Sequence, residues 1–229
     1  MANGSYHVLS LGGSLIVPKS GIDWIFLKKF RSLIIKQIQT GQKFIIIAGG
    51  GTTCRHYQQA ANKVAKLQPV DIDWLGIHAS RLNAHLLRTI FFNIAHPVVV
   101  KDPTRKIKTN AKVIIGAGWK PGWSTDYDAV MLAKTYGASM VINLSNIDYV
   151  CDKDPKKFSG AKKIIEITWP DFRRIVGDKW VPGLSKPFDP IASKFAAELG
   201  LKVIIMNGKK IGNLEKCLAG EKFLGTTIQ

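Results

Sequence analysis

The residues best suited to chemistry lie in segment 118–134, where a loop of glycine, proline and tryptophan runs into an apolar helical pattern. Ser124 and Thr125 supply hydroxyls there, directly before Asp126, and Asp128 follows two residues later. Hydroxyls and backbone N–H groups at a helix N-terminus bind phosphate well, and a carboxylate nearby can help to organise a metal ion. The same residues also make an ordinary helix cap, and the two uses are compatible. We expect Asp128 on the surface.

Glycine or hydroxyl turns follow three strand-like runs of the chain. They occupy residues 11–14, 48–53 and 144–146. In an open α/β sheet ligands bind at the carboxyl ends of the strands, and glycine lets a phosphate approach the backbone closely. The patterns GxxxxGK[ST], GxGxxG on the first turn and GxSxG are all missing, which disfavours a P-loop enzyme, a Rossmann dehydrogenase and a triad hydrolase.

The elements that must position these turns alternate between short β-branched runs and longer helical patterns. This alternation predicts a mainly parallel sheet covered by helices on both faces, an α/β three-layer αβα sandwich. We expect a single domain over residues 1–229, with a soft division into two lobes near residue 144. The expected strands are 6–11, 43–48, 97–100, 112–115, 140–144 and 201–206, and the expected helices are 23–39, 55–66, 73–93, 125–136, 189–199 and 211–218.

The composition is that of a globular protein, with 46% hydrophobic and 21% charged residues among 229. No apolar run approaches the roughly 20 residues of a membrane span, and the first residues lack the basic region of a signal peptide, so we expect a cytoplasmic protein and no membrane partner. Cys54, Cys151 and Cys217 are too far apart to suggest zinc. The net charge of +17 would attract polyanions. We nevertheless do not expect nucleic acid as a primary partner, because no recognition pattern accompanies the charge.

Several motifs in consistent order cover nearly the whole chain. They are LGGSLIVP at 11–18, GGGTTCR at 49–55, DWLGIHASRLNA at 73–84, PGWSTD at 121–126, SNIDYVCDKDP at 145–155, DPIASK at 189–194 and GTTI at 225–228. This order resembles the amino-acid kinase family, and within it the archaeal-type UMP kinases. The resemblance implies transfer of the γ-phosphoryl group of ATP to UMP, with Mg²⁺ as the cofactor.

On the acceptor side, the resemblance assigns the phosphate of UMP to Gly50 and Arg55, because a guanidinium forks onto phosphate oxygens. Asp73 would contact the ribose, although it would serve equally well as the N-cap of its helix. The loop that wraps the acceptor phosphate in the family is matched by Gly122, Trp123, Ser124 and Thr125. The flanking residues Lys120, Pro121 and Asp126 are also implied to bind UMP.

On the donor side, the resemblance places ATP against the first strand end and the segment after residue 144. Cys151 stands where the family often has a tyrosine, and Lys153 would face the β- or γ-phosphate, although a solvated lysine loop is an equal alternative. The residues implied to bind ATP are Gly12, Gly13, Ser14, Gly51, Arg55, Ser145, Asn146, Cys151, Lys153 and Asp154.

The catalytic residues implied by the resemblance are Asp126, Asp189 and Lys186. Asp126 would lie near the transferring phosphoryl group and help to organise the cations there. Asp189 would orient cationic residues, or simply cap the helix before Pro190. Many family members carry a lysine where this chain has Ser10, so Lys186 or Lys153 would have to supply that charge. No dedicated metal ligands are expected.

Two rival functions stay open at this point. One is a kinase of the same fold for another acceptor such as isopentenyl phosphate, whose family members use a histidine near the position of His56. The other is a non-catalytic protein that binds a nucleotide or oxyanion, which Ser10 favours. The resemblance also implies a homo-oligomer, a dimer or hexamer, formed through the helix expected at 73–93.

Overall fold

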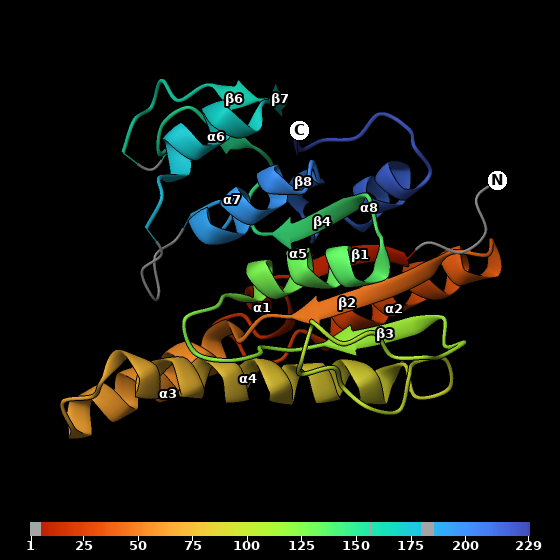
Figure 1. Ribbon diagram of the computed structural model, residues 1–229, viewed down its shortest axis with the longest axis horizontal. Helices are drawn as coiled ribbons and strands as arrows, with labels where there is room; N and C mark the ends of the chain where they lie inside the picture. Colours follow the sequence, from red (N-terminus) through yellow and green to blue (C-terminus); the bar gives the residue numbers. More distant parts are fainter. Residues whose placement is uncertain (1–5, 156, 180–185) are drawn as a thin grey trace.

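A computed structural model describes residues 6–155, 157–179 and 186–229 of the chain. Its main sheet has seven strands in the order β3-β2-β1-β4-β8-β9-β7, and β5 and β6 pair separately. Figure 1 labels the strands from β3 to β8 of this order. The first five strands in that order are parallel, and β9 runs antiparallel to β8. The strands are β1 Tyr6–Leu11, β2 Lys43–Ala48, β3 Val113–Gly116, β4 Met140–Ser145, β5 Val150–Cys151, β6 Lys163–Ile164, β7 Glu166–Ile167, β8 Lys202–Asn207 and β9 Thr226–Ile228.

Helices cover both faces of this sheet, which confirms the three-layer αβα sandwich. In β1, Leu9 and Leu11 face a core shared with α2, α4 and α8, whereas Val8 faces a second core shared with α5, α6 and α7. Alternate residues of a strand point to opposite faces, and the strands of a sheet buried on both sides are therefore mostly apolar. The helices are α1 Gly13–Ile16, α2 Trp24–Gln39, α3 Gly51–Val64, α4 Pro69–Ile90, α5 Thr125–Tyr136, α6 Trp169–Val176, α7 Pro190–Glu198 and α8 Ile211–Leu218.

Short polar side chains start three of the helices that matter for the site. Asp23, Ser124 and Asp189 each accept a hydrogen bond from the backbone N–H three residues further on, and so cap α2, α5 and α7. Such a bond satisfies an N–H group that has no partner inside the helix. At its other end α5 stops at Gly137, whose φ of 70° is left-handed. The bounds of α5 are therefore those the sequence predicts.

Some elements differ from the sequence-based expectation. Helix α4 begins at Pro69 rather than at residue 73, and α3 begins at Gly51 rather than at 55. The apolar run 97–100 contributes only an isolated bridge from Val100 to Gly116 instead of a strand. The sequence also gave no hint of α6, which packs Phe172 into the second core.

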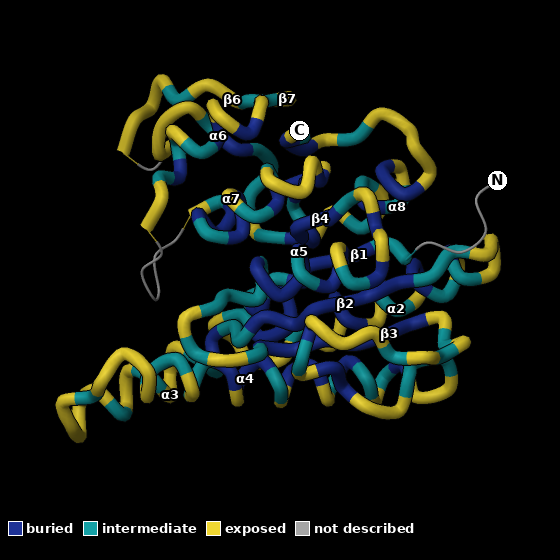
Figure 2. Tube along the Cα trace, viewed as in Figure 1, coloured by how far each residue is buried: buried dark blue, intermediate teal, exposed yellow. Residues whose placement is uncertain are grey.

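Burial follows the layers of the fold. Figure 2 shows buried strands and an exposed far end of α3, which projects beyond the sheet together with the start of α4. Tyr57 and Val64 are 63% and 88% exposed there. Within the described ranges, none of the helices combines the length and apolarity that crossing a membrane would need.

Candidate active site

The candidate site lies where the order of the strands reverses. From β1 the chain adds β2 and β3 on one side, and it then returns with β4 on the other side of β1. The five parallel strands end at the same edge of the sheet, and a crevice between loops of opposite direction is the usual ligand site in such folds. The turns at residues 12–14, 49–51, 117–124 and 145–146 all leave this edge.

The glycine turns after β1 and β2 touch each other through their backbones. A methyl group built on Gly13 would lie 2.0 Å from the backbone nitrogen of Gly51, and one built on Gly49 would lie 2.5 Å from the nitrogen of Gly13. Gly51 also has a φ of +64°. These glycines are thus required by the contact between the turns, in addition to any ligand they bind.

Helix α4 fixes the second glycine turn through a residue to which the sequence analysis assigned no role. The buried Asn83 side chain donates hydrogen bonds to the carbonyls of Gly49 and Gly50, at 2.8 and 3.1 Å. Buried amides of this kind hold loop carbonyls in one orientation. The motif in which Asn83 stands, and not its residue type, was the signal that could have revealed it.

The same helix fixes the loop after β3. Ser80 Oγ accepts from the N–H of Gly118 at 2.8 Å, and Arg81 donates to the carbonyls of Gly118 and Trp119 at 3.2 and 2.9 Å. Further along, the N–H of Gly122 donates to Asp73 Oδ2 at 2.8 Å. The loop backbone is therefore held at several points before any ligand binds.

Asp73 does not cap its helix, so that reading of the sequence is wrong. It lies inside α4, which starts at Pro69, and its carboxylate turns toward the loop at Gly122. Asp73 and Arg55 both influence the pKa of the half-buried Cys54 thiol, although burial is the main cause of its increase. The acceptor residues predicted on α3, α4 and the loop are thus neighbours. The guanidinium of Arg55 is exposed and donates to Thr52 Oγ1 at 2.8 Å.

Asp126 lies at the carboxyl edge of the sheet and connects three elements. Its Oδ1 accepts from the hydroxyl of Ser10 on β1 at 3.0 Å, and its Oδ2 accepts from the backbone N–H of Asp189 at the start of α7, at 3.2 Å. Burial raises the pKa of Asp126 to about 7; the Asp189 charge adds to this increase, and both hydrogen bonds oppose it. Two of the predicted catalytic residues are therefore in contact.

Asp189 also caps α7, so its two sequence-based readings coexist. Its Oδ1 accepts from Ala192 N–H at 2.7 Å. Its Oδ2 is buried and has no partner of good geometry among the described residues, although the nearby Ser124 hydroxyl helps to lower the pKa that burial raises. Lys186 is exposed, and the carbonyl of the next residue, Pro187, accepts from the amide of Asn143, the residue paired with Ser10 across β1 and β4.

The expectation that Asp128 lies on the surface is wrong. Its side chain is fully buried, with 0% exposure, and Oδ2 accepts from the backbone N–H of Trp119 at 3.2 Å. Burial raises the pKa of Asp128 to about 8; the charge of Asp126 also raises it, while the Trp119 hydrogen bond and Arg81 lower it. Two aspartates in the first turns of a helix are usually predicted to be exposed. Asp128 is buried because the loop before α5 packs over this helix.

Aromatic rings line the loop on its α5 side. Trp119 and Trp123 are stacked at 6.3 Å between ring centroids, Trp123 lies 4.0 Å from Tyr127, and Tyr127 stacks on Phe195 of α7. The ammonium of Lys120 lies 4.1 Å from the Trp119 ring centroid, within cation–π range. Pro121, Ser124 and Thr125 belong to the same half-buried surface.

The predicted donor residues lie around the ends of β4 and β5. Ser145 ends β4, Asn146 follows it exposed, Cys151 is half-buried in β5, and Lys153 and Asp154 are exposed. A second group, which the sequence analysis missed, joins the ends of β4 and β8: Asp148 accepts from the Asn207 amide at 3.0 Å and from Lys210 Nζ at 2.9 Å. In the sequence, this group was indicated only by the polar run at the end of β8, which contains Asn207 and Lys210.

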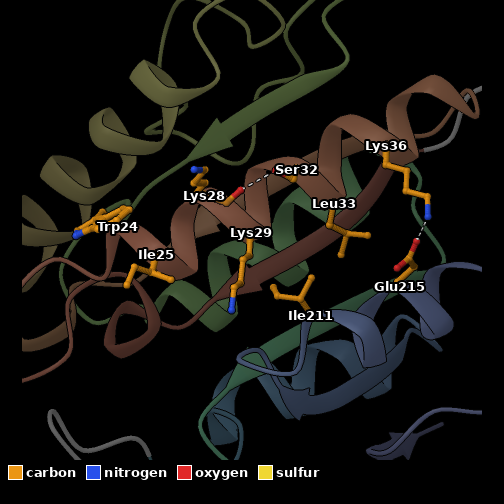
Figure 3. Close-up of a pocket in the computed structure, with 9 residues that line it drawn as sticks. All are labelled: Trp24, Ile25, Lys28, Lys29, Ser32, Leu33, Lys36, Ile211 and Glu215. Atoms are coloured by element: carbon orange, nitrogen blue, oxygen red, sulfur yellow. Dashed lines mark hydrogen bonds and ion pairs between the residues drawn. The ribbon is translucent and has the colours of Figure 1, made fainter.

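A groove of about 670 Å³ lies away from this edge, between α2 and α8 (Figure 3). It is lined by apolar side chains such as Trp24 and Ile211, with Lys28, Lys29 and Lys36 among the lysines around them. The groove contains none of the predicted site residues. The candidate site therefore rests on the geometry of the carboxyl edge and not on this hollow.

Comparison with known proteins agrees with the fold and with the sequence resemblance. Uridylate kinase from Methanocorpusculum labreanum is 33% identical over 226 residues, covering 96% of this chain and 94% of that protein. The crystal structure of uridylate kinase from Archaeoglobus fulgidus matches with a TM-score of 0.80 at 28% identity, covering 98% of this chain and 100% of that one. UMP kinase from Bacillus anthracis, at 20% identity and a TM-score of 0.81, shares the fold. A family model described as the amino acid kinase family matches residues 6–207, and the chain belongs to this family.

Proposed function

We propose that this protein transfers the γ-phosphoryl group of ATP to UMP. The observation that carries the proposal is the N-terminus of α5, where Ser124 and Asp126 stand at the strand switch point, with Asp126 bonded to Ser10 and Asp189. The relatives named uridylate kinases, which match nearly the full chain, support UMP as the acceptor.

In this proposal the acceptor phosphate lies between the second glycine turn and the start of α5. Gly50 and Gly122 offer backbone approach, Ser124 and Thr125 offer hydroxyls, and Arg55 offers a guanidinium fork. A phosphate monoester has its second pKa near 6, so the attacking oxygen is mostly ionised at neutral pH and needs no general base. Asp126 is therefore assigned to positioning and electrostatics, on which phosphoryl transfer mainly depends.

The donor ATP would extend from the first glycine turn toward the ends of β4 and β5. Gly12, Gly13 and Ser14 start α1, and the exposed Lys153 is free to turn toward phosphate oxygens. Among the described residues, no cluster of three or more histidine, cysteine or acidic side chains could hold a metal ion. Mg²⁺ commonly binds through substrate phosphates with few protein ligands, and a cation carried in by ATP would neutralise charge on the phosphates.

The test is ADP release by the purified protein with Mg²⁺–ATP and, in parallel, UMP, CMP, dTMP or isopentenyl phosphate. We expect turnover that strongly prefers UMP. Arg55→Ala should raise the KM for UMP by about tenfold or more, because a charge-assisted contact to phosphate is lost. Lys63→Ala removes a cation from the exposed end of the same helix and should change neither KM.

Other outcomes would redirect the proposal. Turnover of isopentenyl phosphate in preference to UMP would keep the kinase and replace its acceptor. ATP binding without turnover of any acceptor would favour a nucleotide-binding protein, for which Ser10 in place of a lysine is the specific observation. An Arg55→Ala variant with an unchanged KM for UMP would contradict the acceptor assignment.

We further propose self-association through α4. Trp74 and Leu82 lie two turns apart on this helix and are 40% and 63% exposed, whereas Ile77 and Leu87 are buried in the monomer. Large apolar side chains on one exposed stripe often mark an interface. Light scattering coupled to gel filtration would test this by measuring the mass in solution. We expect Leu82→Glu to lower the mass of the wild-type oligomer, and a wild-type protein with the mass of a monomer would contradict the proposal.

A further inference from the structure

The buried carboxyl of Asp128 stands apart from the residues that the proposed reaction uses. It is fully buried, yet it makes one hydrogen bond, from Trp119 N–H to Oδ2, while Oδ1 has no partner within the described part of the chain. A buried polar group that is only partly satisfied destabilises a fold. The hydrogen bond to Trp119 is therefore the contact through which Asp128 can act.

That bond reaches the acceptor loop from the side opposite to α4. Helix α4 holds the loop through Ser80 and Arg81 at residues 118 and 119, and through Asp73 at Gly122. Asp128 belongs to α5, the helix whose N-terminus follows the loop. The amide of Trp119 points to α5 and its carbonyl to α4, so the peptide units around Trp119 are fixed between two helices.

We infer that Asp128 is a positioning residue for the acceptor: by holding the Trp119 N–H, it sets the path of residues 120–124 and thereby the donors that face the acceptor phosphate. The expected change in KM rests on the proposed function. The hydrogen bond between Asp128 and Trp119 holds the loop whether or not UMP is the acceptor. Asp128 touches no reacting atom in this scheme and acts through the backbone of Trp119.

The electrostatics agree with this role. Burial raises the pKa of Asp128 to about 8, which keeps the carboxyl largely protonated at neutral pH. A neutral side-chain oxygen is then enough to accept the Trp119 hydrogen bond. Asparagine has nearly the same shape and retains that oxygen, whereas leucine has a similar shape and removes it.

The experiment compares Asp128→Asn with Asp128→Leu. Leucine should raise the KM for UMP by about tenfold and leave the KM for ATP within about twofold, because the half-buried N–H of Trp119 loses its partner and the loop loses that attachment. It should also speed hydrogen exchange in peptides covering residues 117–124 by about tenfold. Asparagine should restore both quantities to within about threefold of the wild type. Val130→Ala creates a cavity at a fully buried site on the same helix. It should leave both the KM for UMP and the exchange rate of residues 117–124 unchanged.

The result that overturns the inference is a leucine variant whose exchange and UMP KM match those of the wild type, or a Val130→Ala variant that reproduces the leucine effects. Asp128→Ala provides a second removal of the acceptor if leucine disturbs folding. If the wild type fails to phosphorylate UMP, the proposed function is wrong, while the exchange comparison between asparagine and leucine still decides whether Asp128 braces the loop.

Discussion

On the acceptor side of the carboxyl edge, side chains of α4 and α5 hold the loop backbone, whereas on the donor side the segment after β5 presents exposed side chains to solvent. Asn83 and Arg81 show the first arrangement, since each binds two backbone carbonyls. Lys153, which is exposed and lies 5.9 Å from the Phe158 ring centroid, shows the second. A preorganised site loses more when one support is removed than a site built from mobile point charges. Substitutions should therefore have larger effects on the acceptor side.

The contact between the two glycine turns should be the most sensitive point. Gly13→Ala places a methyl group 2.0 Å from the Gly51 nitrogen, so backbone must move. We expect a loss of about 3 kcal/mol or more in the free energy of unfolding, measured by urea denaturation. Gly212→Ala is the matched control, because a methyl there meets nothing within 4 Å. It should be neutral or stabilise by up to about 1 kcal/mol, since alanine is preferred in a helix. Equal unfolding midpoints for the two variants would contradict the contact.

The next largest effect should be on catalysis at the junction of the two sides. Asp126→Asn removes a charge from the point where β1, α5 and α7 meet, and we expect kcat to fall by about 10²- to 10³-fold, as for other preorganised electrostatic groups. Both KM values should stay within about threefold. Asp171→Asn, which alters an exposed carboxylate on α6, should leave kcat unchanged. A kcat for Asp126→Asn close to that of the wild type would reduce Asp126 to a structural role.

The sequence predicts the parts of this comparison that depend on local pattern. Apolar runs and caps define β1, β2, α5 and α8 with the bounds that the structure has. Packing decides the rest. The start of α4 was missed because Gln68 makes no side-chain cap bond there. The short strand β9 depends on its neighbours, since it pairs antiparallel with β8 and parallel with β7.

The positions of the candidate site residues in the fold could be predicted to a similar extent. Glycine turns at strand ends place Gly13, Gly50 and Gly51 correctly at the edge of the sheet. The side chains that hold the loop backbone could not be predicted from residue type. In a sequence, the buried Asp128 cannot be distinguished from an exposed aspartate, because its burial depends on the loop that packs over α5. Asn83, in turn, acts on carbonyls some thirty residues away in the chain, at separations of 33 and 34.

The dependence of stability on pH tests whether the buried Asp128 carboxyl is protonated, and the expected effect is smaller than the two above. The pKa of Asp128 is about 8 in the folded protein, against the usual 3.8 of an aspartate in the unfolded chain. Between these values the unfolded chain releases the proton while the folded protein keeps it, so stability falls as pH rises. The slope for one such group is about 1.4 kcal/mol per pH unit. Asparagine does not titrate, so Asp128→Asn lacks this contribution to the pH dependence of the free energy of unfolding.

We therefore expect Asp128→Asn to gain free energy of unfolding relative to the wild type as the pH rises from about 5 to 7. Asp126, with a pKa of about 7, contributes to the pH dependence of both proteins and largely cancels in the difference. Urea denaturation at several pH values gives the measurement. Parallel curves for the two proteins would mean that the Asp128 carboxyl is ionised in the fold.

The smallest effect should come from the donor side. Lys153→Ala should raise the KM for ATP by about threefold and leave the KM for UMP unchanged, because an exposed ammonium acts as a solvated point charge. Lys157→Ala removes a neighbouring exposed cation and should have no effect on either KM, which separates a specific phosphate contact from the general positive field. A fall of a hundredfold or more in kcat for Lys153→Ala would reverse the comparison. It would mean that Lys153 supplies the charge missing at Ser10, so that the donor side, despite its exposure, carries the electrostatic part of the reaction.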